Sequence, residues 1–195
     1  SAMERLSTGK RINSAKDDAA GLAIATPMTS QVRGMSQAIR NANDGMALAQ
    51  TADGGLNEVT NMLQRVRELA VQSKSGTYST DDRTNLQGEV TQLQAQIDDV
   101  LTNTKFNGVT LFSKVAATDV TVTIQAGAEA ANTIDLTIDG VDGTKITAAA
   151  LDVTTVANSG TTITNVDDAL KSLNATRASL GAGQSRLESA INNLT

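Results

Sequence analysis

Adjacent aspartates are the residues best suited to chemistry in this 195-residue sequence. They form four pairs: Asp17–Asp18, Asp81–Asp82, Asp98–Asp99 and Asp167–Asp168. Two carboxylates that share a site could act as general acid and general base, but neighbouring residues on a helix point about 100° apart. We therefore expect each pair to be solvated charge at a helix end, complementing the helix dipole, rather than a catalytic dyad.

Nucleophilic and metal chemistry have little support in the sequence. It contains no Cys and no His, which removes disulfides, thiolate nucleophiles, histidine-bound zinc and Ser-His-Asp triads. Residues 139–143 (DGVDG) lack the acidic spacing and final Glu of a helix-loop-helix calcium site, so they predict a hairpin turn. Residues 181–183 (GAG) stop short of a dinucleotide-binding fingerprint. We predict a protein that is not an enzyme and that uses no metal and no cofactor.

Composition and charge restrict the possible partners. The formal net charge is -5, which argues against nucleic acid or an anionic membrane as the main partner. Three aromatic residues are too few for a platform that stacks bases or sugars. No apolar run approaches the roughly 20 residues of a membrane span. We expect residues 1–3 to be an expression scar.

The first predicted segment, residues 4–104, carries a long apolar stripe at helical spacing. The stripe consists of Ile24, Met28, Val32, Met35, Ile39, Ala42, Met46, Ala49, Ala52, Leu56, Val59, Leu63, Val66 and Ala70. Its steps average about 3.5 residues, the heptad period of a helix that packs along a partner helix. Four neighbouring positions widen the apolar face: Leu22, Leu48, Met62 and Leu69. Pro27 predicts a kink or a helix start.

A break at residues 75–82 separates this helix from a second one. Gly76 suits a helix end, and Ser79 or Thr80 suits the cap of the next helix. The second helix has its apolar residues at alternating steps of four and three: Leu86, Val90, Leu93, Ile97 and Val100. We expect it to end near Asn103.

The middle segment, residues 105–165, contains no Arg and predicts strands. Residues 120–124 (VTVTI) and 134–138 (IDLTI) alternate apolar with polar, the period of a half-buried strand. Residues 127–132 suit the connection of a hairpin. Asn107–Gly108 predicts a second tight turn.

The last segment, residues 166–195, returns to helical spacing. Leucines recur every seven residues at Leu173, Leu180, Leu187 and Leu194. Arg177 and Gln184 interrupt this seam in our interpretation, and Gly181 and Gly183 weaken the helix by about 1 kcal/mol each. Together the segments predict a mainly α fold, an elongated bundle of long antiparallel helices with a coiled-coil-like seam and a small β-hairpin region.

One outward position of the first helix stands out. Arg65 lies off the apolar stripe, and Leu69, four residues later, shares its face. An arginine beside an exposed leucine is either a small interaction patch or the solvated flank of a bundle.

Several stretches resemble the bacterial flagellin family. Residues 4–21 (ERLSTGKRINSAKDDAAG), 41–45 (NANDG), 64–73 (QRVRELAVQS) and 106–108 (FNG) are similar to its N-terminal signature. Residues 176–194 (TRASLGAGQSRLESAINNL) are similar to its C-terminal signature. The stretches occur in the family's order at both ends of the chain.

The resemblance implies a structural function. A flagellin is secreted and polymerises with other flagellin subunits into the extracellular filament used for motility. The family also implies an export chaperone and hook-associated or cap proteins as partners. The chain resembles a flagellin core without the terminal segments that form the inner tube of the filament, so we expect it to be monomeric by itself.

The resemblance also implies a surface that Toll-like receptor 5 recognises. It carries over to Gln64, Arg65 and Leu69 on the first helix and to Glu89 on the second, and in the family this surface is also buried between subunits. Gly88 stands where the family usually has Ala, and Leu187 where an aromatic is common. Neither departure removes one of the four surface residues.

Two other functions remain open. A hook–filament junction protein shares the helical ends of flagellin. A flagellin-like cell-surface module could instead bind a polysaccharide through the Thr- and Asp-rich middle segment, although the scarcity of aromatics there argues against sugar stacking.

Overall fold

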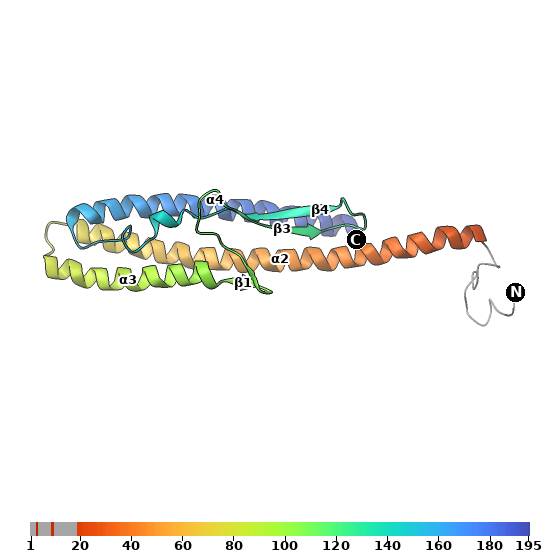
Figure 1. The fold of residues 1–195 in the computed structure, drawn as a ribbon, viewed down its shortest axis with the longest axis horizontal. Coiled ribbons are helices and arrows are strands. Elements are labelled where there is room, and N and C mark those ends of the chain that lie inside the picture. The colour runs from red at the N-terminus through yellow and green to blue at the C-terminus, as the bar shows by residue number, and fades with distance from the viewer. Residues whose placement is uncertain (1–2, 4–8, 10–18) are drawn as a thin grey trace.

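The protein is a rod of three long helices with small β-hairpins along one side. The computed structural model describes residues 3, 9 and 19–195. Its elements are α2 (Ala19–Lys74), α3 (Thr80–Asn103), β1 (Lys105–Phe106), β2 (Val109–Thr110), β3 (Val120–Gln125), β4 (Thr133–Ile138), the 3-10 helix η1 (Gly143–Lys145) and α4 (Val156–Leu194). The helices run side by side along one axis, and β3 and β4 lie against α2 and α4 (Figure 1). The predicted fold class is confirmed.

Helix α2 is the spine of the rod. Its 56 residues correspond to about 84 Å at 1.5 Å per residue. The predicted stripe is buried or half-buried from Met35 to Ala70, where it packs against the other elements. The heptad pattern therefore describes a true packing seam over this part of the helix.

The N-terminal part of α2 departs from the prediction. Ile24, Met28 and Val32 are 64%, 60% and 62% exposed, although they continue the same stripe. In Figure 1, α2 extends well past the C-terminal end of α4, so no described element lies alongside this part of it. The apolar stripe of α2 therefore extends beyond the end of α4, the helix against which it packs.

Pro27 lies inside α2, so the alternative that a helix starts there is wrong. A proline removes the N–H that would bond to the carbonyl four residues earlier, here that of Ala23. Both residues are exposed, so water is available to that carbonyl.

Helix α3 has the predicted boundaries. Ser79 caps its N-terminus, accepting from the Asp82 N–H at 3.1 Å, while the Asp82 carboxylate accepts from the Ser79 N–H at 2.9 Å. This reciprocal pair is a capping box, which satisfies two otherwise unpaired backbone donors. The helix ends at Asn103, as expected.

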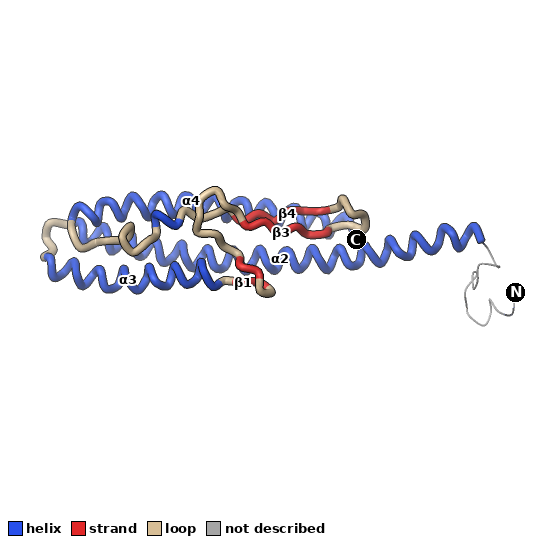
Figure 2. The backbone as a smooth tube through the Cα atoms, viewed as in Figure 1, coloured by secondary structure: helices blue, strands red, loops and turns tan. Residues whose placement is uncertain are grey.

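The hairpin connections predicted at residues 107–108 and 127–132 are both present. Strands β1 and β2 pair antiparallel around Asn107 and Gly108, whose positive φ angles of 50° and 81° suit such a tight turn. Strands β3 and β4 pair antiparallel from Val120–Ile138 to Gln125–Thr133. From β4 the chain follows the bundle as loops and η1 until α4 begins (Figure 2).

Helix α4 begins at Val156 rather than at residue 166. Its buried face uses Thr176 and Gly183, and it leaves Arg177 and Gln184 half-buried at the side. The prediction that Arg177 and Gln184 interrupt the seam is therefore wrong. The buried positions advance by three and four residues in turn: Ser159, Thr162, Val166, Ala169, Leu173, Thr176, Leu180, Gly183 and Leu187.

Gly183 has a packing role. A Cβ atom built there would lie 2.5 Å from Leu136 Cδ2 on β4, so the missing side chain lets the hairpin approach α4. A Cβ at Gly181 would meet nothing within 4 Å. The sequence predicts the same weakening of the helix by both glycines, but only Gly183 has a packing role.

Among the described residues, no helix is long and apolar enough to cross a membrane.

Candidate functional site

The candidate surface is built around Arg65, at the outer boundary between α2 and α3. The Arg65 guanidinium donates from Nε to Glu89 Oε1 at 2.8 Å and from Nη2 to Glu89 Oε2 at 3.2 Å. Its Nη1 donates to Glu68 Oε2 at 3.0 Å. The bond to Glu89 is bidentate, which gives a charge-assisted pair a fixed geometry. One arginine thus links the two helices and binds two carboxylates.

Arg65 remains accessible despite these bonds. The side chains of Arg65 and Glu89 are each 46% exposed. An arginine is charged at any physiological pH, and the hydrogen bonds to Glu89 and Glu68 raise the pKa of Arg65 further. The surface therefore presents a permanently charged, geometrically fixed cluster to a partner.

Arg67 occupies the equivalent position on the other side of α2. It donates from Nε to Asp167 Oδ1 on α4 at 2.8 Å. Val66 lies between the two arginines and is fully buried. Successive residues of α2 therefore contact α3, the core and α4 in turn.

Leu69 does not lie on the outward surface. It is 1% exposed and belongs to the core. The prediction that it widens the apolar face of the helix is therefore confirmed, and the prediction that it shares an open face with Arg65 is wrong. Leu48, Gly55, Met62 and Leu69 follow one another at intervals of seven and form a second inward stripe of α2. Because α2 packs against both α3 and α4, it buries a wider face than one seam requires.

The remaining predicted surface residues are exposed. Gln64 precedes Arg65 on α2, and Glu89 faces Arg65 from α3. Gly88 is also exposed, and a Cβ there would meet nothing within 4 Å. The structure thus joins Arg65 and Glu89, while Gln64 is exposed one residue before Arg65 and Leu69 lies in the core one helical turn after it. Glu68 joins this cluster, and its i,i+3 spacing from Arg65 is the signal that would have identified it.

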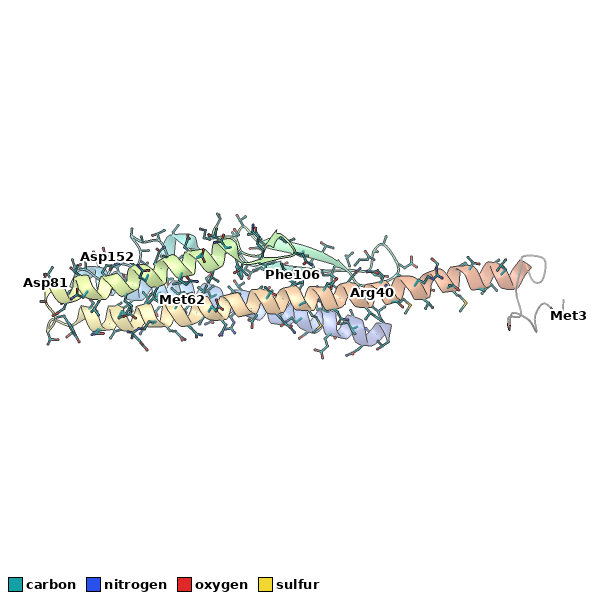
Figure 3. The ribbon with its side chains drawn as sticks, turned by 90° about the horizontal axis from the view of Figure 1, so that it is seen from below. Met3, Arg40, Met62, Asp81, Phe106 and Asp152 are labelled. Atoms are coloured by element: carbon teal, nitrogen blue, oxygen red, sulfur yellow. The ribbon has the colours of Figure 1, made fainter. Side chains whose placement is uncertain are left out.

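Only one described aspartate pair lies at a helix N-terminus. Asp81 and Asp82 occupy the first turn of α3, and Asp81 marks that end of the rod in Figure 3. The Asp82 carboxylate accepts the Ser79 N–H, and this bond and the interaction with the Ser79 side chain hold the pKa of Asp82 below its ordinary value. The expectation of dipole-complementing charge is met here.

The other described pairs have different surroundings, so for them that expectation is wrong. Asp98 pairs with Lys114 at 2.8 Å, near the C-terminal end of α3. Asp167 and Asp168 lie within α4 and pair separately with Arg67 and Lys145. Asp17–Asp18 falls outside the described residues.

No acidic cluster suited to a metal ion occurs in the part of the chain that the structure describes. Asp142 instead caps η1, accepting from the Thr144 N–H at 3.0 Å. The hydrogen bonds from Thr144 lower the pKa of Asp142. Residues 139–142 are a loop that leads from β4 into η1, so the predicted hairpin turn at residues 139–143 (DGVDG) is wrong.

Comparison with known proteins identifies the family at both ends of the rod. Residues 1–117 match the bacterial flagellin N-terminal helical region, and residues 163–195 match the bacterial flagellin C-terminal helical region. A flagellin of Salmonella muenchen is 50% identical over 178 residues, which cover 84% of this chain and 34% of that protein. A flagellin of Serratia marcescens is 44% identical over 190 residues, which cover 94% of this chain and 53% of that protein. The chain therefore spans about a third to a half of the length of these relatives.

Solved structures share the same arrangement of elements. The crystal structure of Bacillus cereus flagellin superimposes with a TM-score of 0.67 at 30% identity, covering 80% of this chain and 89% of that one. A Vibrio parahaemolyticus protein described as flagellar hook-associated has a TM-score of 0.76 at 15% identity, covering 93% and 94% of the two chains. The second similarity concerns the fold alone. With more than half of the sequence matched by the N-terminal region, and the C-terminal region matched on the helix that packs against it, this chain belongs to the bacterial flagellin family.

Proposed function

We propose that this chain forms the helical body of a flagellin subunit, a non-enzymatic structural protein that polymerises with other copies of itself into an extracellular filament for motility. The observation that supports the proposal best is the pairing of α2 with α4, because the two regions that match the family pack on each other to form one rod. Surface ion pairs also join the two helices: Arg67 of α2 pairs with Asp167 of α4, and Asp53 of α2 pairs with Arg177 of α4.

A chimera tests the proposed assembly. The residues of the Salmonella muenchen flagellin that match this chain are replaced by it, and the gene is expressed in a strain without flagellin. We expect filaments visible by electron microscopy and swimming in soft agar. The control chimera carries Val66→Asp, which places a charge in the buried seam and should not assemble. A chimera that is exported and helical but remains unpolymerised would refute the proposal.

We further propose that Toll-like receptor 5 recognises the surface formed by Gln64, Arg65 and Glu89. The exposed bidentate pair supports this assignment, since fixed charged groups and arginines are frequent centres of binding energy at interfaces. Leu69 acts from beneath by holding the α2 backbone in place. The same surface would contact neighbouring subunits in the filament, so assembly would hide it from the receptor.

The receptor assignment is tested with a double variant, Arg65→Ala with Glu89→Ala. In reporter cells that express the receptor, we expect the half-maximal dose to rise by roughly tenfold or more, as when an interface hot spot is removed. The matched control is Arg67→Ala with Asp167→Ala, which removes an inter-helix pair of the same kind on the other side of α2. Far-UV circular dichroism should stay helical for both. Equal responses from the two double variants would contradict the assignment.

A further inference from the structure

Buried polar side chains gather at one end of the rod. The structure has six buried polar or charged residues among those it describes, and four of them are Ser73, Arg83, Ser159 and Thr162. They lie near the C-terminus of α2, the N-terminus of α3 and the N-terminus of α4. Arg83 is 8% exposed, although arginines are rarely buried in proteins. This end of the core is therefore a polar layer, whereas most of the rest is aliphatic.

Each helix places a polar residue where its apolar seam would continue. Ser73 follows the buried Val66 by seven residues on α2, and Ser159 precedes the buried Val166 by seven on α4. On α3, Arg83 precedes the buried Val90 by seven. The heptad spacing thus extends into the layer while the residue type changes.

Arg83 joins α3 to the end of α2. Its Nε donates to the Ser73 carbonyl at 2.7 Å, and its Nη2 donates to the Ser75 carbonyl at 2.8 Å. Ser73 lies in the last turn of α2, where carbonyls have no partner within the helix, and Ser75 follows the end of the helix. A cation at this end also complements the helix dipole. The guanidinium fork therefore satisfies two particular carbonyl groups with one side chain.

The same layer holds the connection that precedes α4. The Ser73 hydroxyl donates to the Val153 carbonyl at 2.5 Å. One helical turn after Arg83, the Gln87 amide donates to the Leu151 carbonyl at 3.3 Å and accepts from the Val153 N–H at 2.7 Å. Each of these side chains bonds to a particular backbone group, so the bonds together fit one alignment of α2, α3 and the connection at residues 151–153.

A repeating apolar seam does not by itself fix the alignment of α3 on α2. A slip of seven residues moves α3 by about 10.5 Å along the axis and again brings apolar residues against apolar residues. A single buried polar residue at a seam position is the device that fixes register in coiled coils. We infer that Arg83 is a positioning residue that sets the register of α3 on α2 and thereby holds Glu89 opposite Arg65. The consequence for receptor recognition rests on the proposed function of that surface.

A distance measurement tests the register directly. The chain has no native cysteine, so spin labels can be attached at Asn57→Cys on α2 and Asn85→Cys on α3, both exposed positions. With Arg83 present we expect one narrow distance distribution. With Arg83→Met we expect a second population or a broad distribution shifted by up to about 10 Å, the length of a heptad slip. A single unshifted distance in a helical Arg83→Met protein would overturn the inference.

Two further variants separate register from stability. Arg67→Met makes the same substitution at an arginine that bonds to α4 instead of linking α3 to α2, and it should leave the α2–α3 distance unchanged. Arg83→Lys keeps the charge but loses the two-pronged donor, so we expect it to resemble Arg83→Met. If the methionine variant does not fold, the lysine variant gives the answer. A narrow native distance in the lysine variant would overturn the role of the two carbonyl bonds.

The receptor assay then uses the same unlabelled variants. We expect Arg83→Met to raise the half-maximal dose several-fold and Arg67→Met to leave it within about twofold, because only the former displaces Glu89. A shifted distance without any change in receptor response would leave the register role intact and refute the proposed recognition surface. An altered response with an unshifted distance would overturn the register role. The two proposals therefore fail separately.

Discussion

At the residue scale, the side chains of Arg65, Val66 and Arg67 point in three different directions in the middle of the rod. Arg65 bonds to α3 and Arg67 bonds to α4, while Val66 is buried between them. Because a helix has 3.6 residues per turn, consecutive side chains point about 100° apart. Three successive residues can therefore contact α3, the core and α4. Both ion pairs are solvent-exposed, so we expect them to orient the surface side chains and to add little to the free energy of unfolding.

Leu69 gives the first prediction at this scale. Leu69→Ala should lower the free energy of unfolding by about 2–5 kcal/mol, because a fully buried leucine is replaced by a cavity. Urea unfolding followed by circular dichroism measures this loss, with Val71→Ala, which truncates an exposed residue two positions later, as the control. A change within about 0.5 kcal/mol for Leu69→Ala would show that the leucine is not packed in the core.

Asp82 gives a prediction about pH. Its pKa in the folded protein is lowered because the carboxylate accepts the Ser79 N–H within the capping box. Its contribution to stability is therefore complete above the unfolded-state pKa of about 3.9 and is lost as the pH falls through the lower folded-state value. We expect Asp82→Asn to be less stable than the parent at pH 7, and the difference to disappear near pH 2.

The matched control for Asp82 is Asp81→Asn. Asp81 lies in the same turn of α3 and has the same charge, but it takes no part in the capping box. Thermal unfolding across the pH range should show a much smaller pH-dependent difference for it. Equal behaviour of the two variants would attribute the effect to the helix dipole instead of the cap.

At the element scale, the close approach of the β3–β4 hairpin to α4 depends on a missing side chain. The hairpin places Leu136 and Ile138, which are fully buried, against the helices. Gly183 leaves room for Leu136, whereas Gly181 is open to solvent. Helix propensity alone disfavours both glycines equally.

Alanine at these two positions should therefore have opposite effects. Gly181→Ala should raise the free energy of unfolding by up to about 1 kcal/mol, since only backbone propensity changes. Gly183→Ala should lower it by about 1–3 kcal/mol, because the new methyl group overpacks against buried Leu136. Denaturant unfolding distinguishes them, and stabilisation by both substitutions would show that the hairpin moves away without cost.

At the scale of the whole molecule, the rod is unevenly supported along its length. Most of α2 packs against other elements, but its N-terminal part projects beyond α4 (Figure 1). Arg40 lies on α2 near the boundary between the packed part and the projecting part, far from Asp81 at the other end of the rod (Figure 3). Isolated helices are marginally stable in water, so packing is what keeps the rest of α2 ordered.

Substituting threonine at two valines of α2 tests this difference. Val66→Thr buries a hydroxyl in the core and should cost about 1–3 kcal/mol. Val32→Thr makes the same change on the projecting part and should alter the free energy of unfolding by less than about 0.5 kcal/mol. Hydrogen exchange should likewise be fast for amides 19–33 and slow for amides near Val66. Similar costs for the two substitutions would mean that Val32 is covered in solution.

The sequence by itself determined most of the elements of this protein, although it placed the start of α4 ten residues too late. The heptad steps, the Ser79 cap, the Asn107–Gly108 turn and the alternating strands are local patterns, and each is found in the structure. It also identified the surface arginine, because Arg65 departs from the apolar stripe. Local patterns suffice here because helix and strand periodicity follow from backbone geometry.

Only the tertiary structure decided which faces of those elements are covered. It buries Leu69, selects Thr176 and Gly183 over Arg177 and Gln184, and leaves Ile24 exposed. The number of neighbours around a helix, and the point at which each ends, depend on contacts between residues far apart in the sequence. The polar layer around Arg83 has the same origin, because its bonds join three segments whose proximity exists only in the folded rod.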